Sequence, residues 1–349
     1  MRVKVSILGH YGKGVNLLNG QTVKTKAITE ELQNQLGEDQ VLKIDTHGGW
    51  KTLLKAPFQV FYALKNSTNV LIFPAHNGLR VYAPLLSFAK KFCNKRKLHY
   101  IVIGGWLPQF LMQRKWLARI LRKFDGIYVE TNTMKSALVT QGFDNVYVMP
   151  NCKKLTVLSE NELVYPSGVP YKLCTFSRVM REKGIETAVN VIKSVNDKLG
   201  FIAYSLDIYG QVDLAQIEWF NSLQKEFPPY IRYGGLVPFD KSVDVLKDYF
   251  ALLFPTYYEG EGFAGTLIDA YSAGVPVIAS DWKYNPELVN ENVGFIYPTW
   301  DQRAFADILK AIALDPTLLL CKKQRCLMEA DKYRIDTVIQ QFIEIIGGI

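Results

Sequence analysis

The sequence predicts an α/β protein built from two doubly wound, Rossmann-like domains. Its 349 residues are enough for two domains, each with a core of its own. Short apolar runs alternate with amphipathic stretches from one end of the chain to the other, and the runs are continuously apolar. Such runs are typical of parallel strands that helices cover on both faces. Residues 151–170 lack this periodicity and are rich in turn formers, which predicts the boundary between the domains.

The strands of both domains can be placed from these apolar runs. In the first domain, residues 1–160, strands are predicted over 3–8, 41–44, 70–73, 100–103, 126–129 and 146–148, with helices between them, as over 22–36 and 107–124. In the second domain, residues 161–330, they are predicted over 172–176, 203–208, 231–233, 251–254, 275–279 and 294–296. The last segment, 331–349, contains an amphipathic helical pattern after the final sheet has ended.

Charge is divided unevenly between the two halves. The chain is 48% hydrophobic and 21% charged, as in an ordinary soluble globular protein, with a net charge of +8. Residues 1–160 contain 23 Lys/Arg and 9 Asp/Glu, a net charge of +14, whereas residues 161–349 contain 18 and 24, a net charge of −6. This asymmetry predicts an anionic partner for the first half, either a nucleic acid or a lipid surface.

Cysteine usage and the apolar runs predict a cytoplasmic protein. The five cysteines are scattered without zinc-type spacing, which favours reduced thiols. The N-terminus leads directly into a strand, so no signal-peptide core is expected. The longest uncharged apolar run, 98–112, is interrupted by glycines and a proline and is too short to span a bilayer.

Two carboxylates mark the most informative stretch of the chain, residues 257–276. Glu261 and Asp269 lie eight residues apart, just over two helical turns, and Gly262 and Gly265 follow the first of them. We expect Glu261 to cap a helix whose first amides are unobstructed, a place that attracts anions and hydroxyl-rich ligands. Asp269 then lies two turns further along, on an adjoining face. The pattern suits a ligand with phosphate and sugar hydroxyls; the alternative is a surface helix with acids in its N-terminal half.

This stretch resembles the Glu-x(7)-Glu signature of retaining glycosyltransferases of family 4, which have the GT-B fold. The trailing Ala-Gly-Val-Pro-Val-Ile is similar too, but Asp269 is one methylene shorter than the usual Glu. Upstream, residues 175–186 resemble the family segment that carries a diphosphate-binding Arg and Lys, which fall on Arg178 and Lys183. The resemblance covers nearly the whole chain but is specific mainly in residues 172–186 and 255–290.

The resemblance implies a role for each matched residue. The two domains would face each other across a cleft, and the segment 331–349 would cross back to the first domain. Glu261 would contact the hydroxyls of the donor sugar, and Asp269 the ribose. The backbone amides of one short run would hold sugar and phosphate: Gly262, Phe263, Ala264, Gly265, Thr266 and Leu267.

The positions of Arg178 and Lys183 in the sequence suggest that both bind a diphosphate. They follow a predicted strand and precede a helix, a usual place for ligands in α/β sheets. Two fixed cations beside a pyrophosphate offset the charge of the leaving group without a metal. The alternative is two solvated basic residues before a helix.

Two loops of the first domain complete the predicted site. The glycine-rich loop at 9–20 does not fit a dinucleotide fingerprint, because Leu17 stands where the third glycine is needed. The resemblance implies that this loop approaches donor phosphate or acceptor, with contacts from Gly14, Gly20 and Gln21. His76 follows the strand at 70–73, where the family places a polar group near the reacting sugar; the alternative is an ordinary loop histidine.

The helical pattern over 107–124 suggests contact with an anionic membrane. Basic residues lie beside an apolar face: Arg114, Lys115, Arg119, Arg122 and Lys123. Such a helix can rest on anionic lipid, with Trp116 or Phe124 as an apolar anchor. The alternative is a packed helix with a solvated basic face.

Together these features predict a retaining glycosyltransferase, a hexosyl or related enzyme that moves a sugar from a nucleotide-diphosphate donor to a glycan or lipid-linked acceptor. We expect a role in cell-surface polysaccharide assembly, at the inner face of the cell membrane. No Asp-x-Asp site is evident in the right context, so neither a metal nor any cofactor beyond the donor is expected.

Three alternatives were weighed against this function. A sugar-nucleotide epimerase of the same fold would need further acidic residues and histidines in its cleft, and the chain has only four His. The second alternative is a non-catalytic subunit that binds a nucleotide sugar. It stays open because Asp269 replaces the usual Glu. No nucleic-acid recognition motif accompanies the positive charge, so a nucleic-acid partner is not expected.

Overall fold

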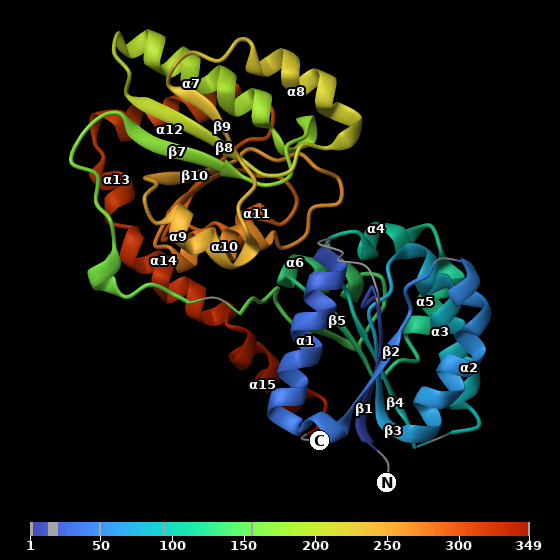
Figure 1. Ribbon diagram of the computed structural model, residues 1–349. Helices are drawn as coiled ribbons and strands as arrows, with labels where there is room; N and C mark the ends of the chain where they lie inside the picture. The colour runs from blue at the N-terminus through green and yellow to red at the C-terminus, as the bar shows by residue number, and fades with distance from the viewer. Residues whose placement is uncertain (1–2, 13–19, 49, 94, 155, 348–349) are drawn as a thin grey trace. The chain divides into compact units, whose positions relative to one another are not determined.

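The computed structural model describes residues 3–12, 20–48, 50–93, 95–154 and 156–347. It divides into two compact units. One contains Met1–Lys154 and Arg334–Ile349, and the other contains Leu155–Tyr333. From the sequence, the divisions were expected at 160/161 and 330/331. Each unit is a parallel sheet between layers of helices (Figure 1).

The sheet of the first unit has six strands in the order β2-β1-β3-β4-β5-β6, and every pairing is parallel. The strands are β1 (Val3–Gly9), β2 (Val41–Asp45), β3 (Ser67–Ile72), β4 (Lys97–Ile101), β5 (Gly126–Val129) and β6 (Val146–Val148). Each contains one of the predicted runs or most of it, except β4, which shares only residues 100–101 with the run predicted over 100–103. Val5, Ile7, Val70 and Leu71 are fully buried, as expected of central strands covered on both faces.

The helices beside this sheet are α1 (Gly20–Leu36), α2 (Trp50–Asn66), α3 (His76–Lys90), α4 (Leu107–Met112), α5 (Lys115–Leu121), α6 (Asn132–Val139) and α15 (Ile335–Ile345). The last of them packs against α1. Its apolar side, Val338, Ile339 and Phe342, joins the same core as Val5 and Ile7 of β1. The C-terminal helix is therefore part of the first unit.

The single helix predicted over 107–124 is wrong. The chain forms α4 and α5 with a break at Arg114, whose backbone is not helical (φ −134°, ψ 61°). A continuous helix would place residue 114 near the buried face that Leu111 begins, and the chain has a charged side chain there. In the structure its guanidinium lies 4.0 Å from the centre of the Phe110 ring. Phe124, one of two proposed membrane anchors, is buried, whereas Trp116 is half exposed.

The sheet of the second unit also has six parallel strands, in the order β12-β11-β10-β7-β8-β9. They are β7 (Tyr171–Phe176), β8 (Tyr204–Tyr209), β9 (Ile231–Gly235), β10 (Ala251–Phe254), β11 (Val277–Ser280) and β12 (Gly294–Tyr297). The helices are α7 (Ile185–Leu199), α8 (Ile217–Gln224), α9 (Ser242–Leu246), α10 (Gly265–Ser272), α11 (Asn285–Leu288), α12 (Gln302–Leu314), α13 (Thr317–Leu320) and α14 (Lys323–Ala330).

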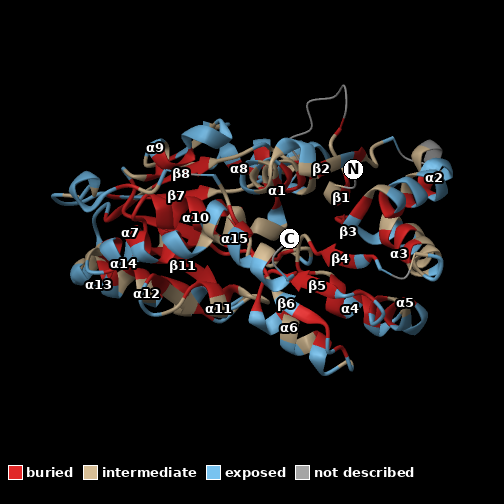
Figure 2. Cartoon of the chain, turned by 90° about the horizontal axis from the view of Figure 1, so that it is seen from below, coloured by how far each residue is buried: buried red, intermediate tan, exposed pale blue. Residues whose placement is uncertain are grey.

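Two hydrophobic cores hold this sheet between its helices. Residues of α7, α8 and α12 form one core with the sheet, and residues of α9, α10 and α14 form the other. The central strands β7, β8 and β11 are accordingly coloured as buried in Figure 2. The strand order runs outward in both directions from the neighbouring pair β7 and β10. This is the topological switch point of the sheet, and ligands of such sheets bind outside the carboxyl ends of the strands there.

Candidate functional site

A pocket lies at this switch point, formed entirely by the second unit. Its volume is about 280 Å³. The lining residues follow β7 and β10 and lead into α10: Phe176, Ser177, Arg178, Met180, Lys183, Phe254, Tyr258, Glu261, Ala264, Gly265 and Thr266. Both sequence motifs therefore meet in one place, and six of the predicted site residues line it.

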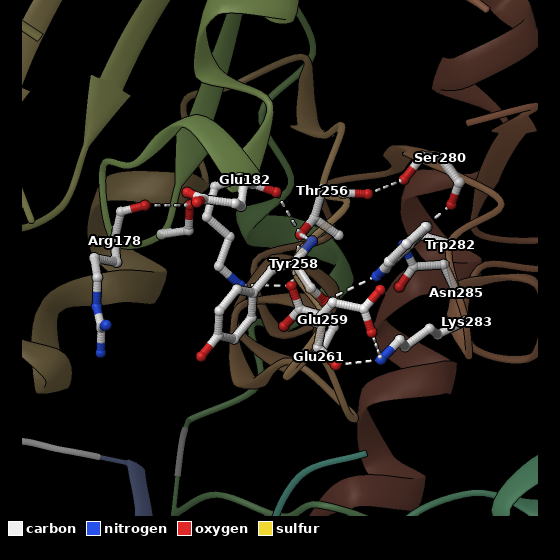
Figure 3. Close-up of polar contacts among 12 residues, drawn as sticks. Arg178, Glu182, Thr256, Tyr258, Glu259, Glu261, Ser280, Trp282, Lys283 and Asn285 are labelled. Carbon is white, nitrogen blue, oxygen red and sulfur yellow. Dashed lines mark hydrogen bonds and ion pairs between the residues drawn. The ribbon is translucent and has the colours of Figure 1, made fainter. Parts of the chain in front are cut away.

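An ion pair between the two motifs stands in this pocket (Figure 3). The Lys183 ammonium donates to Glu261 Oε2 at 2.5 Å, and the Thr256 hydroxyl donates to the same oxygen at 2.7 Å. The side chains of Lys183 and Glu261 are only 12% and 7% exposed. The ammonium also lies 5.0 Å from the centre of the Tyr258 ring. A carboxylate buried to this extent needs a charged partner, and Lys183 provides it.

Glu261 does not cap a helix, so that prediction is wrong. The helix α10 begins at Gly265, and Ala264 is its N-cap residue. Glu261 lies earlier, in a turn where its amide donates to the Tyr258 carbonyl at 3.0 Å. Its carboxylate is directed to Lys183, because a buried ion pair gains more than a cap with an exposed acid. Ala264 itself makes no side-chain hydrogen bond to the start of α10.

Thr266 gives this helix start a polar group for a ligand. Its hydroxyl is buried and has no hydrogen-bond partner among the residues that the structure describes. It lines the pocket with Ala264 and Gly265. Buried hydroxyl groups are nearly always paired, so an unpaired one in a residue that lines a pocket is a candidate partner for a polar ligand atom.

The remaining residues of the predicted run lie away from the pocket. Asp269 is in the second turn of α10 and is 3% exposed. Phe263 and Leu267 are buried in the adjoining core, and the Phe263 ring packs edge-to-face against Tyr333. Gly262 and these three residues do not line the pocket.

Arg178 and Lys183 have different environments. Arg178 is exposed at the pocket, with its guanidinium 3.6 Å from the carboxylate of Asp213. Lys183 ends a 3-10 turn, Arg181–Lys183, and is held against β10 by Gly184. Gly184 has a left-handed backbone (φ 71°), and a Cβ there would stand 2.1 Å from the Pro255 carbonyl oxygen. Only glycine permits this approach, which places Lys183 beside the loop carrying Glu261.

Several residues of the neighbouring loops were missed in the sequence. The Trp282 indole donates to the Tyr258 carbonyl at 2.8 Å, and Lys283 pairs with Glu259 at 2.8 Å (Figure 3). The exposed Trp300 packs on Tyr257 with ring centres 4.2 Å apart. Among the described non-glycine residues, Lys283 and Trp300 alone have positive φ angles, of 49° and 73°. Backbone strain of this kind is common at functional sites. The sequence alone did not reveal these residues, because Trp and Lys near strand ends are too common to mark a site.

The first unit has a pocket of its own, of about 510 Å³. It is lined by His10, Gln21, Thr46, Gly48, Pro74, Ala75, His76, Asn77, Gly78 and Tyr82, at the carboxyl ends of β1, β2 and β3. Gln21 and His76 both line this pocket, and the Gln21 amide donates to the Phe73 carbonyl at 3.0 Å. Gly20 begins α1 but does not line the pocket. Gly14 lies outside the described residues.

His76 stands at the first turn of α3 against an aromatic wall. Its ring lies 3.9 Å from that of Trp106. Burial lowers the pKa of His76, and the guanidinium groups of Arg114 and Arg80 lower it further. The imidazole is therefore held neutral near pH 7, a form that can donate through one nitrogen and accept through the other. A second pair, His10 and His47, is joined by a 2.9 Å hydrogen bond in the same region.

The comparisons with known proteins concern first the unit that carries both motifs. Residues 170–315 contain every residue of the switch-point pocket, and this segment matches one known family. That family is glycosyl transferases group 1. The match confirms the resemblance predicted from the motifs around Arg178 and Glu261 at the level of glycosyl transferases group 1.

A curated protein similar to part of this chain is the amylovoran biosynthesis glycosyltransferase AmsK of Erwinia amylovora. It is 26% identical over 145 residues, which are 40% of this chain and 35% of that protein. The matched part thus spans about a third of the length of that relative.

Solved structures resemble the chain over nearly its whole length. Sucrose-phosphate synthase from Thermosynechococcus elongatus superposes with a TM-score of 0.76 at 15% identity, over 99% of this chain and 98% of that one. Alr3699/HepE of Anabaena, in complex with UDP and glucose, superposes with a TM-score of 0.73 at 14% identity, over 100% of both chains. With the two six-stranded parallel sheets, these similarities confirm the predicted fold, GT-B.

Two further findings bear on this glycosyltransferase fold. Across the ranges that the structure describes, no three His, Cys, Asp or Glu side chains come together as a metal site would require. No helix in those ranges combines the length and the apolar character needed to cross a membrane.

Proposed function

We propose that this protein is a retaining glycosyltransferase, which moves a sugar from a nucleotide-diphosphate donor to a glycan or lipid-linked acceptor. One observation carries the proposal. The pocket at the β7–β10 switch point holds a buried Lys183–Glu261 ion pair, the exposed Arg178 and the unpaired Thr266 hydroxyl. Cations, a carboxylate and a helix start with a buried hydroxyl are the groups that a sugar diphosphate needs.

Each group has a distinct part in the proposed reaction. As the bond between the anomeric carbon and the diphosphate breaks, negative charge grows on the departing oxygen. Arg178 and Lys183 stabilise that charge, which lowers the barrier because it exists mainly in the transition state. Glu261 accepts hydrogen bonds from sugar hydroxyls and keeps Lys183 in place before the donor binds. The N-terminus of α10, with Thr266, receives phosphate oxygens.

We propose that no metal ion is required, because Arg178 and Lys183 supply the positive charge that a metal would otherwise provide. The expected result is turnover unaffected by a chelator such as EDTA. Loss of turnover with EDTA, restored by added Mg²⁺ or Mn²⁺, would contradict this part of the proposal.

The donor and the acceptor are proposed from the relatives. HepE was solved with UDP and glucose, so a UDP-hexose is the first donor to test. AmsK is a glycosyltransferase of amylovoran biosynthesis, which favours an acceptor in cell-surface polysaccharide assembly. We place the protein at the cytoplasmic face of the membrane, with the exposed basic residues of α5, Lys115 and Arg119, and Lys123 just after it, toward anionic lipid.

A donor panel tests this function directly. Thermal unfolding is measured with UDP, GDP, ADP and the corresponding sugar nucleotides, because a ligand of the native state raises its melting temperature. Nucleotide release is then followed with lipid-linked acceptor. A shift by one nucleotide class together with release of that nucleotide supports the enzyme. A shift without release favours a non-catalytic binding subunit, and no shift by any nucleotide overturns the proposal.

A further inference from the structure

Residues 46–124 of the first unit contain no acidic residue. This stretch holds 14 Lys/Arg between Asp45 and Asp125. At the overall frequency of 33 acids in 349 residues, a stretch of its length would contain about seven. It forms α2, α3, α4 and α5, the helices that Figure 1 shows together on one side of the first sheet. The positive charge of the first half is therefore concentrated in these helices and the segments that connect them.

The helix α2 is apolar on two opposite faces. One stripe faces the core and is buried: Ala56, Val60, Ala63 and Leu64. The other stripe faces outward: Leu54 is 68% exposed, Phe58 79%, Phe61 62% and Tyr62 52%. Positions i, i+4, i+7 and i+8 lie on one side of a helix. A surface helix normally carries polar residues on its outer side. An exposed apolar stripe there indicates an interaction surface.

The neighbouring helix α3 ends with two further exposed aromatic residues. The helix α2 packs against α3, where the Tyr82 hydroxyl donates to Gln59 at 2.6 Å. At the end of α3, Phe88 and Phe92 are 61% and 76% exposed, with ring centres 5.5 Å apart. The exposed lysines Lys55 and Lys65 lie on α2 itself. Aromatic side chains beside lysines on one helical face are typical of segments that lie in a membrane interface.

We propose that the outer face of α2, with Phe88 and Phe92, inserts into the interface of an anionic bilayer and orients the first unit on it. This deepens the membrane location given under the proposed function and rests on it. The exposed cations of α5 supply long-range attraction, and α2 supplies the apolar contact that Phe124, being buried, does not provide. Binding of such a surface grows with the apolar area inserted and with attraction to anionic lipid.

Charge selects a bilayer over the other partners of an apolar face. A second copy of the chain on this face would bring two acid-free, basic layers together and would be repelled. An anionic bilayer is complementary to the exposed charged residues of this stretch, all of which are basic. It also accepts a flat row of aromatic side chains without a shaped pocket.

The test replaces the two most exposed aromatic residues of α2, as Phe58→Ser with Phe61→Ser in the full-length chain. Partitioning onto vesicles of phosphatidylglycerol and phosphatidylcholine is measured by sedimentation. The double variant should bind about tenfold more weakly or worse than the wild type, with an unchanged melting temperature, because both side chains are exposed. The matched control is Leu214→Ser with Phe239→Ser, 78% and 71% exposed in the second unit, and it should bind like the wild type.

Other outcomes separate this inference from the proposed membrane location. If Phe58→Ser/Phe61→Ser binds vesicles like the wild type while Lys115→Gln/Arg119→Gln/Lys123→Gln does not, the α2 inference is overturned and the membrane location stands. If the wild type does not bind vesicles, both are overturned. A wild-type dimer in sedimentation velocity that the double serine variant dissolves would assign the face to a second copy instead.

Discussion

Lys183 and Glu261 serve both the stability of the second unit and its proposed chemistry. Each is nearly buried and each neutralises the other. Removing one partner leaves the other charge uncompensated in a poorly solvated place, which is strongly destabilising for buried pairs. Arg178 differs, because it is 57% exposed and its contact with Asp213 is 3.6 Å long. The two basic residues of the pocket should therefore respond differently to substitution.

Arg178→Ala should reduce turnover while leaving the fold unchanged. Loss of a charge-assisted contact to a leaving group costs about 2–4 kcal/mol of transition-state stabilisation. Lys183→Ala should reduce turnover similarly and also lower the melting temperature, since Glu261 loses its partner. Initial rates and thermal unfolding measure the two effects. The control is Arg303→Ala, whose side chain is 92% exposed on α12. Rates within about threefold of wild type for both variants, under 1.4 kcal/mol, would remove the proposed roles.

The resemblance implies that Asp269 binds ribose, whereas the structure buries this residue in α10. If its carboxylate binds ribose, Asp269→Asn should weaken UDP binding measured by calorimetry. Asp269→Glu restores the usual acid, but the position is 3% exposed, and an added methylene in a packed interior costs about 1–3 kcal/mol of stability. Unchanged UDP affinity in Asp269→Asn would show that the carboxylate is structural, part of α10 and not of the site.

His99 should make the first unit sensitive to mild acid. It is buried in β4, where Nδ1 accepts from the Tyr128 hydroxyl and Nε2 donates to the Asn69 amide oxygen, at 3.1 Å each. Both bonds fit the neutral ring, and burial lowers its pKa from 6.5 to about 4. Between these values the unfolded chain binds more protons than the folded one, so stability falls as the pH falls.

The loss through His99 is about 2 kcal/mol between pH 7 and pH 5. Urea unfolding of wild type and His99→Gln at both pH values measures it. The variant, although less stable at pH 7, should lose about 2 kcal/mol less on acidification. An identical loss in the two proteins would show that other groups cause the acid sensitivity.

At the scale of elements, Gly184 connects α7 to the site. A side chain there meets the Pro255 carbonyl and has an unfavourable φ angle, whereas Gly200, at the other end of α7, has φ 75° but open space around it. Gly184→Ala should cost about 2–4 kcal/mol of stability and weaken UDP binding, because Lys183 must move. Gly200→Ala, with the conformational penalty alone, should cost about 1 kcal/mol and leave binding unchanged. Equal effects at both positions would mean that the close approach is unimportant.

The strands were predictable because parallel strands are buried on both faces. An apolar run such as 251–254 becomes β10 (Ala251–Phe254) without help from distant residues. Helix ends were less predictable, since Arg114 interrupts the helix through its local contacts with Phe110. The meeting of Arg178, Lys183 and Glu261 followed from the motifs. The orientation of Glu261 did not, because it depends on a partner 78 residues away and on Thr256.

At the scale of the whole molecule, the two units differ in charge and, under the proposed function, in what they bind. The acid-free stretch 46–124 lies entirely in the first unit, and the switch-point pocket lies entirely in the second. Under the proposed function, a soluble donor and a membrane-bound acceptor would be held by separate surfaces. Changes to the basic layer should therefore alter membrane binding without altering donor binding.

Three cations of this layer can be removed without disturbing local structure. Arg114 and Arg122 donate to backbone carbonyls, of Phe110 and Gln141, so their loss would affect packing. Lys115, Arg119 and Lys123 are exposed. Each contributes up to about 1 kcal/mol near an anionic surface, screened over a Debye length of about 8 Å at physiological salt. Lys115→Gln/Arg119→Gln/Lys123→Gln should therefore weaken vesicle binding strongly at low salt and less at high salt.

Sedimentation with phosphatidylglycerol vesicles at both salt concentrations measures this effect, and UDP affinity is measured in parallel. The control carries the same loss of charge in the second unit, as Lys225→Gln/Lys241→Gln/Arg303→Gln, and should bind vesicles like the wild type. Equal weakening in both triple variants would mean that net charge alone drives association. Salt-independent binding of the wild type would instead leave the apolar face of α2 as its sole cause, because screening acts on charges and not on buried apolar area.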